Sequence, residues 1–235
     1  MVLRELQLEI VNQPTDTTCG PTCLHALYDY YDRPLPLDQI IAEIPALELG
    51  GTLAVHLANH AMRRGFSATI YTYNLQIFDP TWFHPNPQPL AEKLKAQAAA
   101  KPEPKLKLAT QAYLDFLELG GQVKYEDLTP PMIRKILEQD HPILTGLSST
   151  FLYRSQREIE ATCADDDIAG YPCGHFVVLC GYHRQDKTVK VADPSSPNPF
   201  SPSPYYFIPI NRLVGAIYLG VLTYDANMLI LQPRR

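Results

Sequence analysis

The sequence feature that most constrains the fold is a continuous apolar run at positions 175–182, with Gly174 and Gly181 at its two ends. An apolar run of this length, without regular polar alternation, is typical of a strand that is buried on both faces. The next segment, 188–192, alternates between polar and apolar residues and is followed by Asp193. Together the two segments predict an antiparallel pair whose first strand is central in a sheet.

Helical and strand patterns are divided unevenly along the rest of the chain. Apolar residues at helical spacing predict helices at about 19–31, 38–44, 53–64, 90–100, 106–119 and 130–137. For the third of these helices we expect Thr52 as the N-cap. Alternating or β-rich stretches predict strands at 6–10, 66–73, 142–147, 215–223 and 228–231. Because helices come first and an antiparallel sheet follows, the predicted class is α+β.

Length and composition favour one domain with a sizeable core. The chain has 235 residues, of which 46% are hydrophobic and 19% are charged, as in ordinary globular proteins. We therefore expect a single domain over 1–235. The segment 79–121 begins with a Pro-rich stretch and continues with two predicted helices, so we interpret it as a helical insertion or lobe within that domain.

Charge and cysteine content indicate where such a chain works. The net charge of −5 and the lack of a basic cluster argue against nucleic acid as a partner. Acidic Glu5 and Glu9 interrupt the start of the chain, which predicts no export signal, and no apolar run reaches membrane-spanning length. Five cysteines without a framework spacing are typical of free thiols. We therefore expect a cytoplasmic protein with no membrane partner and leave its oligomeric state open.

Cys19 has the surroundings that a reactive thiol needs. A nucleophilic thiol must be a thiolate, and a free cysteine titrates at about 8.5. A helix N-terminus and a neighbouring imidazolium both favour the thiolate. Cys19 lies at the start of a predicted helix, and Gly20 leaves little bulk beside the sulfur. Cys19 is therefore the candidate nucleophile.

His175 is the best of the seven histidines as a partner for that thiol. It opens the predicted central strand, so its ring would stand at a sheet edge beside the core. The following strand brings Asp193 to the same end of the antiparallel pair, where a carboxylate can orient the imidazole ring. These positions also fit a histidine and an aspartate at ordinary strand–loop junctions, and the three residues alone do not separate the two interpretations.

Gln13 favours the catalytic interpretation. Acyl transfer needs a hydrogen-bond donor for the developing oxyanion, commonly a side-chain amide together with a backbone N–H. Gln13 lies six residues before Cys19, and the turn-rich residues between them can fold its amide back beside the sulfur. The candidate catalytic residues are therefore Gln13, Cys19, His175 and Asp193.

These motifs resemble those of a known family. Gln13 followed by Cys19-Gly20-Pro21-Thr22-Cys23-Leu24, then Gly174-His175-Phe176-Val177-Val178-Leu179, then Asp193-Pro194, resembles the bacteriocin-processing (double-glycine) peptidases among the papain-like cysteine peptidases. The resemblance implies a papain-like fold with the cysteine on a central helix packed against an antiparallel sheet that carries the histidine and aspartate. It also implies Gln13 as oxyanion donor, Cys19 as nucleophile, His175 as base and then acid, and Asp193 as the residue that orients the histidine.

The chain departs from the transporter-linked members of that family. Those members carry membrane and nucleotide-binding domains, whereas this sequence has neither a membrane-length apolar run nor a glycine-rich phosphate loop. It also has the additional segment 79–121. We therefore expect a stand-alone member and do not carry over cleavage after a double-glycine leader.

Other constellations give weaker alternatives. Cys163, Cys173, His175 and Cys180 lack the paired spacing of a zinc site, and Asp165-Asp166-Asp167 lacks the spacing of a calcium loop. We expect Cys23 to be a buried apolar residue, with a Cys19–Cys23 redox pair as the minor alternative. The polar stretch at 148–154 fits a substrate-contact loop and an ordinary turn equally well.

The resulting hypothesis is a cysteine hydrolase that cleaves a peptide or related amide bond through a thioester acyl-enzyme. It implies a peptide or amide substrate, no cofactor and no metal. One alternative keeps the same site but transfers the acyl or peptide group to an amine. Another, from a different class, is a catalytically silent papain-like module that binds peptides.

Overall fold

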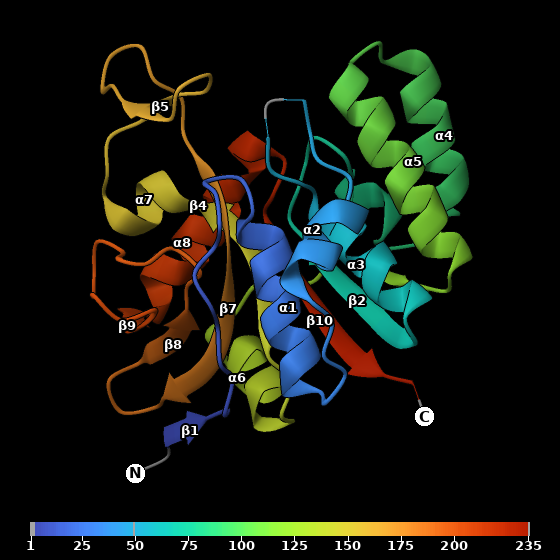
Figure 1. The fold of residues 1–235 in the computed structure, drawn as a ribbon. Helices are drawn as coiled ribbons and strands as arrows, with labels where there is room; N and C mark the ends of the chain where they lie inside the picture. Colours follow the sequence, from blue (N-terminus) through green and yellow to red (C-terminus); the bar gives the residue numbers. More distant parts are fainter. Residues whose placement is uncertain (1–2, 49, 235) are drawn as a thin grey trace.

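The computed structural model describes residues 3–48 and 50–234, and it has an α+β architecture built on one large sheet (Figure 1). All neighbouring strands in this sheet are antiparallel except for one parallel pair at the end of the order. The strand order is β3 (Gln122–Lys124), β2 (Phe66–Thr72), β10 (Asn227–Pro233), β4 (Ile143–Ser148), β7 (Gly174–His183), β8 (Thr188–Ala192) and β9 (Tyr205–Pro209), with β1 (Leu3–Glu5) paired to β7.

The apolar run at 175–182 forms β7, and the prediction of a central strand is confirmed. β7 pairs with β4 on one side and with β8 on the other, and β1 extends the pairing near its end. Residues 175–182 are all buried, as a strand covered on both faces requires. The predicted strand at 188–192 matches β8 residue for residue.

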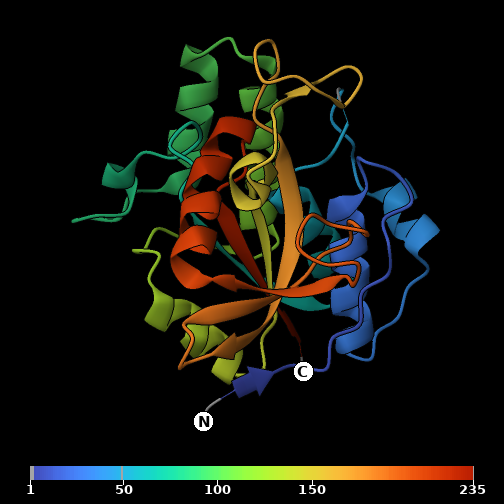
Figure 2. The ribbon, with the colours of Figure 1, turned by 90° about the vertical axis from the view of Figure 1, so that its left-hand side faces the viewer.

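Helices cover both faces of the sheet. On one face, α1 (Cys19–Tyr30) packs against β7, and α3 (Ala54–Arg63) packs against β2 and β10. On the opposite face, α8 (Ile210–Leu219) packs against β4 (Figure 2). The shorter helices α2 (Leu37–Glu43), α6 (Pro130–Glu138) and α7 (Ser149–Tyr153) pack around these layers, and a two-stranded hairpin, β5 (Glu158–Ile159) with β6 (Ala164–Asp165), projects beyond α7.

The predicted insertion at 79–121 contains a short 3-10 turn, η1 (Pro80–Trp82), followed by the two helices α4 (Leu90–Ala100) and α5 (Pro104–Glu118). The helices pack on each other, and α5 packs on α3. Leu94, Leu106 and Phe116 are fully or almost fully buried and belong to the same hydrophobic cluster as the sheet residues. The insertion therefore contributes to the main core.

Two predicted strands are wrong. Residues 215–223 form the end of α8 and a 3-10 turn, η2 (Gly220–Thr223), because this segment covers β4 instead of joining the sheet. Residues 6–10 lie outside every named strand. Their apolar side chains are buried, but the backbone of Leu8 and Ile10 hydrogen-bonds to the Tyr205 hydroxyl and not to a strand ladder.

The predicted N-cap at Thr52 is also wrong. The N-cap of α3 is Leu53, and the Thr52 hydroxyl instead donates to the carbonyl of Pro45 at 2.8 Å. No helix within residues 3–48 and 50–234 combines the length and the apolar character that a membrane crossing requires.

Candidate active site

Cys19 is the first residue of α1, as the sequence predicts, and it is buried with 6% of its surface exposed. Thr18 at the N-cap makes no capping hydrogen bond, because its hydroxyl donates to the carbonyl of Thr15 instead. Pro21 in the first turn has no backbone N–H to satisfy. The positive end of the helix dipole is thus left without a side-chain cap beside the sulfur.

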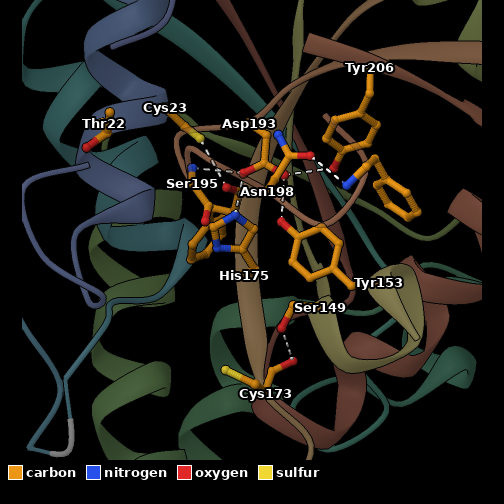
Figure 3. A network of polar contacts seen from close by, with 12 residues as sticks. Thr22, Cys23, Ser149, Tyr153, Cys173, His175, Asp193, Ser195, Asn198 and Tyr206 are labelled. Carbon is orange, nitrogen blue, oxygen red and sulfur yellow. Dashed lines mark hydrogen bonds and ion pairs between the residues drawn. The ribbon is translucent and has the colours of Figure 1, made fainter. Parts of the chain in front are cut away.

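His175 and Asp193 come together at one end of the β7–β8 pair. His175 is the second residue of β7, and Asp193 directly follows β8. The imidazole Nε2 lies 2.8 Å from Asp193 Oδ1, and the two residues are 7% and 0% exposed (Figure 3). Because Nε2 is engaged by the carboxylate, Nδ1 is the ring nitrogen left for the sulfur.

The charges of this pair depend on each other. Burial opposes a charged imidazole, but the Asp193 carboxylate outweighs that effect and, with a hydrogen bond to Cys19, raises the pKa of His175 to about 10. Burial opposes the Asp193 carboxylate as well, but His175 and two tyrosine hydroxyls hold the pKa of Asp193 below its ordinary value. The arrangement therefore favours an ion pair next to the Cys19 thiol.

Two tyrosines that sequence analysis did not place in the site anchor Asp193. The hydroxyls of Tyr153 and Tyr206 donate to Asp193 Oδ2 at 2.6 and 2.7 Å, and the backbone N–H of Ser195 donates to Oδ1 at 3.0 Å (Figure 3). With His175, Asp193 thus has four hydrogen-bond partners. Tyr206 follows the strand alternation of β9 and carries no motif, so only the sheet pairing of β8 with β9 could have indicated it.

Gln13 lies beside the residue that follows Asp193. Its backbone N–H donates to the carbonyl of Pro194 at 2.9 Å. Its side-chain Oε1 is buried and has no hydrogen-bond partner among the described residues. Because Oε1 can only accept hydrogen bonds, an oxyanion would need the N–H groups of the same amide, and the role of Gln13 as oxyanion donor stays a prediction.

The remaining cysteines have surroundings that disfavour their thiolates. Burial raises the pKa of Cys23, and its thiol donates to the Phe176 carbonyl at 3.3 Å. Burial likewise raises the pKa values of Cys173 and Cys180 to about 12. Cys163 is exposed, but partial desolvation and neighbouring acids raise its pKa too.

The polar stretch at 148–154 is part of the scaffold around the site. Ser148 accepts a hydrogen bond from the backbone of Phe151 and so caps α7. Ser149 and Thr150 bind the carbonyl and the N–H of Cys173, respectively, which ties α7 to the residues just before His175. These contacts explain the polar residues in this stretch without a direct role in substrate binding.

The alternative metal sites have no geometric support in the described residues. Within 3–48 and 50–234, no group of three or more His, Cys, Asp or Glu side chains is arranged to hold a metal ion. The carboxylate of Asp166 instead accepts the backbone N–H groups of Ile168 and Ala169 and so stabilises a turn.

Sequence comparison decides the family. The model of the Peptidase_C39 like family matches residues 5–201, which include α1, β7 and Asp193. The chain belongs to this family. Membership supports a cysteine peptidase-like protein and confirms the resemblance on which the predicted fold was based. None of the curated proteins compared with the chain is similar enough to count as a match.

Among the solved structures similar to this chain, one with a TM-score above 0.5 supports the same fold. A protein from Bacillus anthracis described as a C39-like peptidase shares 12% identity, with 100% of each chain covered and a TM-score of 0.52. A double-glycine-motif protease from an AMS/PCAT transporter, crystallised with its leader peptide, shares 15% identity, with 99% of each chain covered and a TM-score of 0.46. The peptidase domain of Streptococcus ComA, a bifunctional ABC transporter, shares 13% identity, with 97% and 100% covered and a TM-score of 0.44.

Proposed function

We propose that this protein is a cysteine peptidase that hydrolyses a peptide bond through a thioester formed on Cys19. The observation that carries the proposal is the buried His175–Asp193 pair, 2.8 Å apart, together with the Cys19 thiol at the start of α1, which is among the groups that raise the pKa of the imidazole. A helix N-terminus and an imidazolium are the two surroundings that stabilise a thiolate.

The proposed reaction begins with the Cys19 thiolate and the His175 imidazolium. The sulfur attacks the substrate carbonyl, and the resulting oxyanion accepts hydrogen bonds from the Gln13 amide and the Cys19 backbone N–H. His175 then donates its proton to the departing amine, which leaves the acyl group on sulfur as a thioester. In the second half, His175 takes a proton from water, the hydroxide attacks the thioester, and the acid product leaves with the thiolate restored.

In this mechanism Asp193 is a positioning residue. It holds the imidazole through Nε2, so that Nδ1 faces the sulfur, and its charge favours the imidazolium. Tyr153 and Tyr206 hold the carboxylate in turn. A catalytic thiol of this kind needs a reducing compartment such as the cytoplasm.

The direct test is turnover of internally quenched peptides by the purified protein and by Cys19→Ala. We expect cleavage by the wild type and none by Cys19→Ala, which should keep its native circular dichroism spectrum because the substitution removes only one sulfur atom. Retained activity in this variant would falsify the proposal. Mass spectrometry with an added amine acceptor separates hydrolysis from transfer, and binding without turnover by the wild type would indicate the silent module.

A further inference from the structure

A second buried carboxylate, Asp225, lies close to the site but has no part in the proposed mechanism. It lies between η2 and β10 and is 5% exposed. Its Oδ2 accepts a hydrogen bond from the Thr223 hydroxyl at 2.9 Å. Within the described part of the chain, Oδ1 has no hydrogen-bond partner, and it is not fully buried. The carboxylate forms no ion pair with any described residue.

Two glycines make room for this carboxylate at the end of the sheet. A Cβ added to Gly174 would lie 2.6 Å from Asp225 Oδ2, and a Cβ added to Gly146 would lie 2.7 Å from Oδ1. Gly174 directly precedes His175 in β7, and Gly146 lies on the adjacent strand β4. The carboxylate therefore lies against the backbone that carries the histidine.

One aromatic ring connects Asp225 with the nucleophile. Atoms of the Phe176 ring lie 2.9 Å from the Cβ position of Gly146 and 3.2 Å from that of Gly20, which follows Cys19. The Phe176 ring thus lies between the start of α1 and Gly146 on β4, the glycine against which Asp225 packs.

The surroundings of Asp225 leave its charge poorly compensated. Burial raises the pKa of Asp225 to about 7, against the opposing effects of Thr223, Lys105 and His175. The Lys105 ammonium lies over the Tyr224 ring, 4.6 Å from its centre, and does not pair with the carboxylate. The charge of Asp225 also contributes to the raised pKa of Tyr113, which, like Lys105, is on α5. A buried carboxylate with one free oxygen is stabilised strongly by an added cation.

We propose that Asp225 binds the ammonium or guanidinium group of a substrate side chain adjacent to the scissile bond, so that the preferred substrates are basic peptides. The inference rests on the proposed function, because it names the substrate class of the same site. Thr223 orients the carboxylate, and the two glycines leave room for it beside the backbone that carries His175.

The experiment compares matched libraries of internally quenched octapeptides in which one position at a time carries either lysine or uncharged norleucine. At one position near the cleaved bond, we expect the wild-type kcat/KM for the lysine peptide to be at least about tenfold above that for the norleucine peptide. A factor of about ten is what one charge-assisted hydrogen bond contributes. Asp225→Asn should bring this ratio close to one. Glu92→Gln, which removes an exposed acid on α4, is the matched control and should leave the ratio unchanged.

The pH dependence of the same ratio gives a sharper test. Titration of the free catalytic pair affects both substrates equally and cancels in the ratio, so the remaining change reports the group that binds lysine. We expect the ratio to rise as the pH passes through about 7, because Asp225 ionises there. Lys105→Met should move this inflection to higher pH, since the lysine charge lowers the pKa of Asp225. Asp225→Asn should remove the inflection.

Binding separates this inference from the proposed function. Calorimetric titration of Cys19→Ala with the lysine and norleucine forms of one peptide measures the preference without turnover. Tighter binding of the lysine form by about tenfold supports the inference even if the protein cleaves nothing. Equal binding, or a wild-type ratio that is near one at every position and pH, would overturn it, and cleavage of both peptide forms would then leave the proposed function intact.

Discussion

The backbone N–H of Gln13 donates a 2.9 Å hydrogen bond to the carbonyl of Pro194. This bond joins the segment that leads into α1 to the residue that follows Asp193. The proposed oxyanion donor and the proposed positioning carboxylate are therefore fixed to one another through the backbone, although Asp193 lies 180 positions after Gln13 in the sequence. The side chain of Gln13 can change without breaking the connection.

Gln13→Ala should lower kcat by roughly 10²–10³, the usual cost of losing one oxyanion donor. Because the described Gln13 side chain has an unpartnered Oε1 and the anchoring bond comes from the backbone, the free energy of unfolding should change little. Initial rates with an internally quenched peptide give kcat, and urea unfolding gives the free energy of unfolding. A kcat within twofold of the wild type would exclude Gln13 from the oxyanion site.

Tyr206→Phe should destabilise the protein by roughly 1.5–3 kcal/mol, because it removes a hydrogen bond to a buried charge. Tyr206 and Tyr153 donate to the same oxygen of Asp193, so their effects should not be additive. Urea unfolding of the two single variants and the double variant gives the coupling free energy. Independent, additive losses would argue that the two hydroxyls do not share one charged acceptor.

Asp193→Ala should reduce kcat/KM less than His175→Ala. Water can partly replace a residue that orients the imidazole, but it cannot replace the imidazole that transfers the proton. Asp193→Ala should also be the less stable variant, since it leaves the buried hydroxyls of Tyr153 and Tyr206 without their acceptor. Kinetic constants corrected for the folded fraction decide the order, and an equally inactive, fully folded Asp193→Ala would contradict it.

A short iodoacetamide pulse at about pH 6 should label Cys19 before the other four cysteines. Cys23, Cys173 and Cys180 are buried or half-buried with raised pKa values, and Cys163 is exposed but also has a raised pKa. Only Cys19 has the His175 cation beside it. Peptide mapping identifies the labelled thiol, and His175→Ala is the control that should suppress labelling. Faster labelling of Cys163 or Cys173 would reopen the choice of nucleophile.

The His175–Asp193 pair should make stability depend on pH. Folding raises the pKa of His175 from about 6.5 to about 10, so its contribution is complete below about pH 6.5 and is lost as the pH rises toward 10. Folding lowers the pKa of Asp193, so its contribution is lost only at acidic pH, below about 4. The difference in unfolding free energy between wild type and Asp193→Asn should therefore shrink from pH 6 to 9.5. A constant or growing difference in urea unfolding would contradict the ion pair.

The sequence predicts the structural positions of Cys19, His175 and Asp193 because the patterns that place them are local. The cysteine at a helix start and the histidine at the start of a buried strand both follow from short patterns, and the histidine lies against Asp193 as the antiparallel pairing requires. The family resemblance supplied the roles, and the geometry of the pair is compatible with them.

The sequence does not predict which elements support those groups. Tyr206 resembles any strand tyrosine, and only the pairing of β9 with β8 brings its hydroxyl to Asp193. The β-rich composition of 215–223 predicts a strand, but the segment packs as a helix on β4, where Gly215 lies against the Phe151 ring. These are tertiary contacts between distant segments, and a periodicity in one segment contains no information about them.

The position of β10 in the sheet has a consequence for synthesis of the protein. Residues 227–233 lie between β2 and β4, so they are the only link in the described sheet between the β3–β2 pair and the strands that carry His175 and Asp193. Until these residues have left the ribosome, the β3–β2 pair cannot join the rest of the sheet. The edges of β2 and β4 are then exposed in the nascent chain. The complete sheet, and with it the support for the His175–Asp193 pair, therefore forms only after β10 has left the ribosome.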